Sequence, residues 1–226
     1  MGISSRPFPA GAVVRTGAER ATLVRRTYAL VLAGVLVTMA GAAFAFTQPA
    51  LLGFVARHPF ITFLVTFAPL LAAQALRDRF PLNIGLTLLF TFAEGVFLAP
   101  LLLLMESRQP GVIGQTALLT GSTFGVLTLY AFVSRRDFSA WGGFFVTGLW
   151  VLIAASLMNF FFGNATADLW IAAVGTFVFS GLLVFDTWRL RNVYGPDDYV
   201  PAAVNIYLDL LNLFLFILRL LGGRRD

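Results

Sequence analysis

The chain has no cysteine and no lysine, and it has a single histidine among its 226 residues. Without cysteine it can form neither a disulfide bond nor a thiolate metal site, and it cannot use a cysteine nucleophile. Charged residues are scarce, at 12% of the chain, whereas a soluble globular protein contains about 25%. Hydrophobic residues make up 58% and the mean hydropathy is +0.84. This composition is typical of an integral membrane protein, and the length favours one domain.

Seven hydrophobic runs are long enough to cross a bilayer, which takes about 20 apolar residues in a helix. They cover residues 27–47, 59–76, 82–104, 111–133, 138–162, 167–188 and 201–221. Proline, glycine and charged residues mark the breaks between them. The sequence therefore predicts an all-α protein with seven transmembrane helices. A basic N-terminal arm at 1–26 precedes the membrane domain at 27–221, and a short tail at 222–226 follows it.

The arginines predict the orientation of these helices. Most of the sixteen fall in the N-terminal arm and in the connections on the same side of the membrane. Basic connections stay in the cytoplasm, so we expect a cytoplasmic N-terminus and a C-terminus outside. A re-entrant last run would return the C-terminal arginines to the cytoplasm, but its length favours a full crossing. The first run is expected to act as an uncleaved signal anchor.

The N-terminal arm and the net charge of +5 also bear on partners. The arm is expected either to lie on anionic lipid headgroups or to be an uninvolved tail. The arginines form short clusters between apolar runs, which is how a membrane protein anchors its connections. The positive charge is therefore not interpreted as a sign of nucleic-acid binding.

Two aspartates lie inside the last two hydrophobic runs, Asp186 in FSGLLVFDTWRLR and Asp209 in NIYLDLLNLFLF. A carboxylate at membrane depth costs several kcal/mol, so it must face the protein interior, find a partner or serve a function. Both are expected in the cytoplasmic half, where Arg77 ends the second run and Arg79 is a close alternative. Two carboxylates in contact cannot both ionise cheaply, so such a pair would titrate as a unit.

Further polar residues accompany this pair. Four residues of the last run share one helix face and predict a polar stripe that faces the bundle: Asn205, Asp209, Asn212 and Arg219. Glu94 is a third intramembrane acid, within FTFAEGVFLAP. It either hydrogen-bonds a backbone carbonyl or a Ser/Thr as a protonated acid, or lies on an ion or proton path. His58, before a proline, is expected to be a solvated connection residue.

The closing segments carry a resemblance to a known family. FSGLLVFDTWRLR followed by NIYLDLLNLFLFILRLLG resembles the last two helices of the Bax inhibitor-1 family, also called transmembrane Bax inhibitor motif proteins. Tyr207-Leu208-Asp209 and Asn212-Leu213-Phe214 match the last-helix motif. PLNIGLTLLFTFAEG at 81–95 is also similar to members of the family.

The resemblance, which is to bacterial members, implies six helices around a central seventh in the bacterial inner membrane. It further implies a pH-sensitive calcium leak channel, with calcium as the permeant ion and no cofactor. Asp186 and Asp209 would share a proton and contact calcium transiently, and Arg77 would latch to Asp186. Calcium-leak members can carry an acid inside the second span, whereas 59–76 has none.

Other functions also fit two membrane aspartates. An intramembrane aspartyl protease would share the Phe185-Asp186 element, but Asp209 lacks the Gly-x-Gly-Asp pattern and no Pro-Ala-Leu follows, so no enzyme is expected. The GSTFG run at 121–125 is better explained as a small-residue helix contact than as a rhomboid-type serine site. A non-conducting regulator that binds membrane proteins or proteases remains open, with the polar groups only joining helices. A proton-coupled calcium exchanger also remains open.

Overall fold

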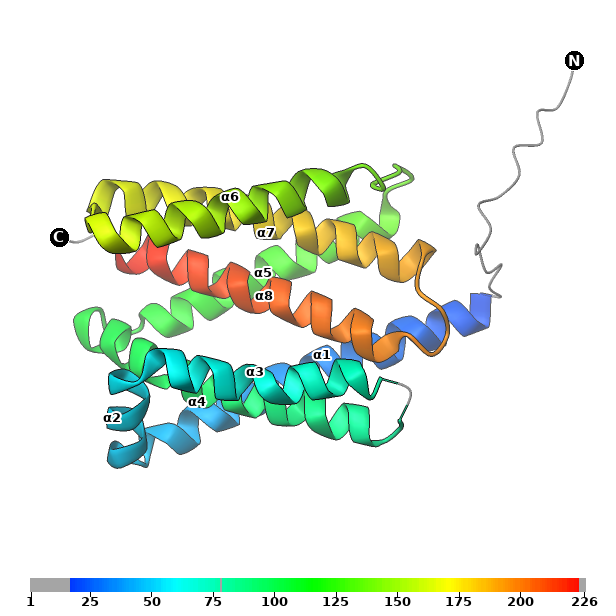
Figure 1. Ribbon diagram of the computed structural model, residues 1–226. Helices are drawn as coiled ribbons and strands as arrows, with labels where there is room; N and C mark the ends of the chain where they lie inside the picture. The colour runs from blue at the N-terminus through cyan, green and yellow to red at the C-terminus, as the bar shows by residue number, and fades with distance from the viewer. Residues whose placement is uncertain (1–16, 78, 224–226) are drawn as a thin grey trace, which may run out of the picture.

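The computed structural model describes residues 17–77 and 79–223. These residues form eight α-helices, and none of them lies in a β-strand. The helices are α1 Gly17–Phe46, α2 Pro49–Arg57, α3 Pro59–Ala75, α4 Leu82–Arg108, α5 Val112–Val133, α6 Trp141–Phe162, α7 Ala165–Asn192 and α8 Tyr199–Gly222. The long helices run side by side, and the short α2 lies across one end (Figure 1). The all-α prediction is confirmed for this part of the chain.

Six of the predicted spans are helices long and apolar enough to cross a membrane: α1, α4, α5, α6, α7 and α8. The remaining predicted span, 59–76, corresponds to α3, which has 17 residues. It follows α2 after a bend of 103°, so the two helices form a broken pair that can supply one further crossing. The described residues therefore contain six candidate spans by length and composition, and the pair raises the number to seven if it crosses as one.

Helix α2 is a feature that the sequence did not predict, because the residues around it looked like a break. Pro49 occupies the start of α2, where its missing N–H costs no helical hydrogen bond. The bend comes at His58, which has the non-helical angles φ −126° and ψ 55°. A residue before proline is pushed out of the α region, and Pro59 follows directly. His58 is exposed between the two helices, as expected.

The first helix also departs from its predicted bounds. We expected residues 1–26 to form an arm, but α1 already begins at Gly17. Leu23 explains the longer helix, because its side chain is 1% exposed and packs in the main hydrophobic core with residues of α7 and α8. The rest of the predicted arm, 1–16, and most of the predicted tail, 224–226, lie outside the described residues.

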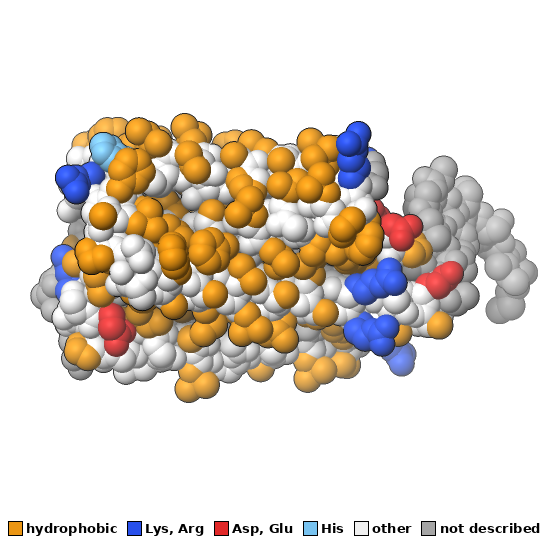
Figure 2. All heavy atoms as spheres, turned by 90° about the horizontal axis from the view of Figure 1, so that it is seen from below, with side chains coloured by type: hydrophobic (Ala, Val, Ile, Leu, Met, Phe, Trp, Pro, Cys, Tyr) orange, Lys and Arg blue, Asp and Glu red, His pale blue; other side chains and the backbone are white. Residues whose placement is uncertain are grey.

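The exposed charged side chains gather at the two ends of the bundle. One end, here called the basic end, holds the start of α1 and the connections α3–α4, α5–α6 and α7–α8. Most described arginines lie there, and hydrophobic side chains cover much of the face between the two ends (Figure 2). The described arginines of the opposite end are Arg57, Arg108 and Arg219. An apolar belt between polar ends is what a bilayer requires of a spanning bundle.

The interior of the bundle is built on two sets of contacts. Helix α8 packs against α1, α4, α5 and α7. Helices α1 and α4 approach each other closely at Gly41 and Gly95. A Cβ atom on Gly95 would overlap the carbonyl oxygen of Thr38, and one on Gly41 would overlap that of Phe92. Small residues of this kind let two membrane helices meet backbone to backbone.

Candidate functional site

The site lies where α7 and α8 meet near the basic end. Asp186 is in the penultimate turns of α7, and its side chain is 10% exposed. Arg189 follows one turn later on the same helix and donates from Nη1 to Oδ1 of Asp186 at 2.8 Å. Spacing of i, i+3 places two side chains on one helix face, which explains this ion pair locally.

Asp209, on α8, lies beside the Asp186–Arg189 ion pair. Its side chain is buried, and its carboxyl group lies within hydrogen-bonding reach of the Asp186 carboxyl. Oxygen Oδ2 of Asp209 has no hydrogen-bond partner among the described groups. Two carboxyl groups in contact, one of which faces a guanidinium, are most stable with one proton between them. The structure thus brings Asp186 and Asp209 together at one place.

Arg189 links the carboxyl pair to the connection between α7 and α8. Its guanidinium lies over two aromatic rings, 4.8 Å from the centre of Tyr194 and 5.6 Å from that of Phe185. The Tyr194 hydroxyl accepts a 2.7 Å hydrogen bond from Nδ2 of Asn205, which lies one turn before Asp209. Burial raises the pKa of the Tyr194 hydroxyl, so the hydroxyl keeps its proton at physiological pH. A continuous polar chain thus runs from α7 through the connection to α8.

Arg77, the cation predicted from the sequence, lies elsewhere at this end. Its side chain is exposed, and it lines an open cavity of about 870 Å³ together with Arg26, Asp197 and Asp198. Within the described part of the chain, the guanidinium bound to Asp186 belongs to Arg189 and not to Arg77. The prediction from the sequence chose Arg77 because its expected membrane depth matched that of the aspartates, and it overlooked Arg189. The signal was present, since an arginine three residues after Asp186 stands on the same helix face.

The predicted polar stripe of α8 divides among three places. Asn205 and Asp209 join the site. Asn212 instead donates to the carbonyl oxygen of Leu208 on its own helix, at 2.8 Å. Arg219 lies at the opposite end, where it forms an ion pair with Asp168 at the start of α7. Of the four predicted residues, Asp209 is buried and the other three are half-buried, and only Asn205 and Asp209 belong to the carboxyl pair.

Glu94 is separate from this site. It is buried on α4 beside Gly95, and its Oε2 oxygen has no hydrogen-bond partner among the described groups. Tyr207 of α8 lies in the same part of the bundle, and its hydroxyl is 2.7 Å from Oγ1 of Thr38. No group of three or more acidic or histidine side chains that could hold a metal ion occurs among the described residues. The carboxyl pair therefore supplies only part of the six to eight oxygens that calcium takes.

These features define a class: a multi-pass, all-helical membrane protein with a buried carboxyl pair between its last two helices. The family described as "Inhibitor of apoptosis-promoting Bax1" matches residues 20–226. The chain is 33% identical over 205 residues to the Golgi anti-apoptotic protein of vaccinia virus (strain Lister), across 89% of this chain and 85% of that protein. Bax inhibitor 1 of Schizosaccharomyces pombe is 33% identical over 207 residues, covering 90% and 77% of the two chains.

A bacterial relative agrees with this match. A membrane protein of Vibrio cholerae is 40% identical over 139 residues, which cover 60% of this chain and 61% of that protein. The chain therefore belongs to the Bax inhibitor-1 family.

Proposed function

We propose that this protein is a pH-gated calcium leak channel of the bacterial inner membrane, and that the Asp186–Asp209 pair is its proton sensor. The observation that carries the proposal is a buried contact between two carboxyl groups of which one is held by Arg189. Calcium is the permeant ion, which the carboxyl oxygens contact transiently. We propose neither an enzymatic activity nor a resident cofactor.

The proposed topology has seven crossings, with the α2–α3 pair counted as one and α8 at the centre. The contacts of α8 with α1, α4, α5 and α7 support a central position. The arginine bias supports a basic end that faces the cytoplasm, with the C-terminus outside. The carboxyl pair then lies in the cytoplasmic half and would respond to cytoplasmic protons.

The proposed gate works through the charge of Asp186. At neutral pH the pair holds one proton, Asp186 is ionised, and Arg189 binds it. Acidification adds the second proton and removes the charge that Arg189 binds. Arg189, which also lies over the ring of Tyr194, is then no longer fixed by Asp186. Its contact with the α7–α8 connection weakens, and α7 and α8 can separate. A difference of a few kcal/mol between closed and open states is enough for such a switch, which is the scale of one buried charged contact.

Calcium flux into proteoliposomes at several pH values tests this gate. Asp186→Asn removes the titrating group, so we expect a leak that no longer changes with pH. Asp168→Asn is the comparison, because it breaks an ion pair between the same two helices at the opposite end and leaves both titrating carboxyl groups in place, so its leak should still change with pH. If Asp186→Asn keeps the wild-type pH profile, the pair is not the sensor.

The same experiment separates the channel from the two alternatives. A regulator that only binds partner membrane proteins conducts no calcium at any pH. An exchanger moves calcium only in return for protons that flow down their gradient, so an ionophore that collapses this gradient would stop the calcium transport. A leak channel continues to conduct when the proton gradient is removed.

Replacing Glu94 by Gln tests whether Glu94 lies on an ion or proton path. A residue on the path would change the calcium flux, whereas a structural residue would change the stability of the protein.

A further inference from the structure

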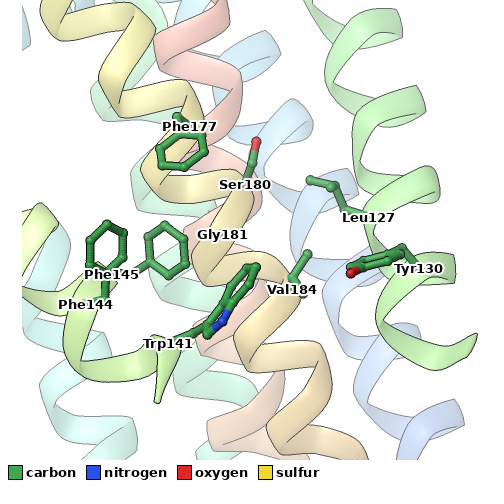
Figure 3. Close-up of a pocket in the computed structure, with 9 residues that line it drawn as sticks. All are labelled: Leu127, Tyr130, Trp141, Phe144, Phe145, Phe177, Ser180, Gly181 and Val184. Carbon is green, nitrogen blue, oxygen red and sulfur yellow. The ribbon is translucent and has the colours of Figure 1, made fainter. Parts of the chain in front are cut away.

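A groove opens on the lipid-facing side of the bundle, between α5 and α6. Both helices pack against α7, which forms the floor. The cavity between them measures about 520 Å³ (Figure 3). Its walls are almost entirely apolar and come from Leu127 and Tyr130 of α5, Trp141 and Phe145 of α6, and Phe177 and Val184 of α7.

Close packing of α6 on α7 defines the floor of the groove. The ring of Phe145 is 3% exposed and rests on Gly181 of α7, where a Cβ atom would overlap it. Phe144 and Phe177 remain 66% and 63% exposed, so the groove is open to the side. In a spanning bundle, an open apolar groove at this depth faces the hydrocarbon chains of the bilayer.

Aromatic rings line the end of the groove nearest the basic end. Phe138 is fully buried, and its ring lies 6.0 Å from that of Tyr130 and 4.8 Å from that of Trp141. Trp and Tyr gather at the depth of the lipid headgroups, because one part of each ring system is apolar and the other polar. The hydrocarbon part of an occupant would therefore end at these rings.

Basic side chains follow directly beyond the rings, in the connection between α5 and α6. Arg135 and Arg136 are exposed there. The neighbouring Asp137 accepts a 2.8 Å hydrogen bond from the backbone N–H of Ser139. Arg191 is occupied as well, because it donates to carbonyl oxygens at the end of α5, including that of Phe132 at 2.6 Å. The connection thus presents two arginines to the headgroup region, above an apolar groove.

We propose that the groove binds an anionic phospholipid, with one acyl chain between α5 and α6 and the phosphate on Arg135 and Arg136. Complementarity at both ends of the lipid carries the assignment: apolar walls for the chain and two cations for the headgroup. Basic sites beside membrane helices bind anionic headgroups in this manner. The inference does not depend on calcium conduction.

Tryptophan fluorescence tests the site, since bromine atoms on an acyl chain quench a tryptophan that they touch. The four tryptophans are Trp141, Trp150, Trp170 and Trp188. Full-length variants keep only Trp141 or only Trp150, with Phe at the other three positions. Trp150 is the control, because it is 68% exposed on α6 and does not line the groove.

Each variant is placed in vesicles that contain increasing fractions of brominated phosphatidylglycerol or brominated phosphatidylcholine. We expect Trp141 to be quenched at a lower fraction of the anionic lipid, and Trp150 to respond equally to both. Arg135→Gln and Arg136→Gln should each weaken the preference at Trp141 about fivefold. In the unmodified protein, native mass spectrometry should show retained phosphatidylglycerol that the double Gln variant loses.

Three outcomes would overturn the proposal. Equal quenching of Trp141 by both lipids would mean that the headgroup is not recognised. An equal anionic preference at Trp150 would mean a general lipid shell in place of a site. Absence of quenching at Trp141 would mean that another protein surface, such as a second copy of the chain, covers the groove.

Discussion

At the scale of single residues, the partner of Asp186 matters most. The Arg189–Asp186 contact is a hydrogen bond between charged groups, and such bonds contribute about 1.5–3 kcal/mol. Every 1.4 kcal/mol changes a population ratio about tenfold. Replacing Arg189 by Gln should therefore raise the calcium leak at neutral pH roughly tenfold, toward the level of the acid-opened wild type.

Arg77→Gln is the comparison for this variant, measured in the same vesicles. Arg77 lines a different cavity, so its replacement should leave the neutral-pH leak close to that of the wild type. The reverse result, a raised leak for Arg77→Gln alone, would show that Arg77 holds Asp186 in the conducting protein and would contradict the role of Arg189.

The two carboxyl groups were predicted from the sequence, whereas their cation was missed although its signal was present. A charged residue within an apolar run is visible without a structure, because its energetic cost requires an explanation. Membrane depth narrows the choice of partner but does not tell which helix ends are neighbours. The i, i+3 relation of Asp186 and Arg189 is local and was readable. The link from Arg189 through Tyr194 to Asn205 depends on the path of the connection, which no pattern in the residues specifies.

At the scale of helices, the crossing of α1 and α4 depends on glycine. A side chain at Gly95 meets the backbone of α1, and overpacking of this kind costs about 1–3 kcal/mol. Gly95→Ala should therefore lower the thermal unfolding midpoint in detergent. Gly85→Ala is the matched control on the same helix, because a Cβ atom there has no neighbour within 4 Å. Alanine favours a helix by up to about 1 kcal/mol over glycine, so Gly85→Ala should leave the midpoint unchanged or raise it.

A comparison of predicted and observed helix bounds shows which local sequence signals were sufficient to predict the ends of helices. The prolines, glycines and charges that separate the long runs predicted the ends of α4 to α8 closely. The region of α2 was misjudged because Pro49 and Pro59 were taken as breaks, whereas each starts a helix. The extra turns at the start of α1 carry Glu19 and three arginines, and Leu23 among them packs into the main hydrophobic core.

At the scale of the whole molecule, the orientation proposed from the arginines can be measured directly. The absence of cysteine gives a background free of reactive thiols. Ser107→Cys and Ser139→Cys place one thiol at the exposed opposite end and one at the basic end. In intact cells, a membrane-impermeant maleimide should label Ser107→Cys and spare Ser139→Cys. The opposite pattern would invert the topology, and labelling of both positions would contradict a spanning bundle.

In the proposed gate, the ion pair of Arg219 with Asp168 would be the point about which the last two helices turn. It ties α8 to α7 at the end away from the carboxyl pair. Asp168 and Asp186 are separated by 18 positions (186 minus 168), which is about 27 Å of helix at about 1.5 Å per residue. A rotation of about 10° around the tie would carry the Asp186 carboxyl by about 5 Å along an arm of that length. In the proposed gate, the loss of one charge at Asp186 would therefore tilt α7 relative to α8 about the ion pair at their other end.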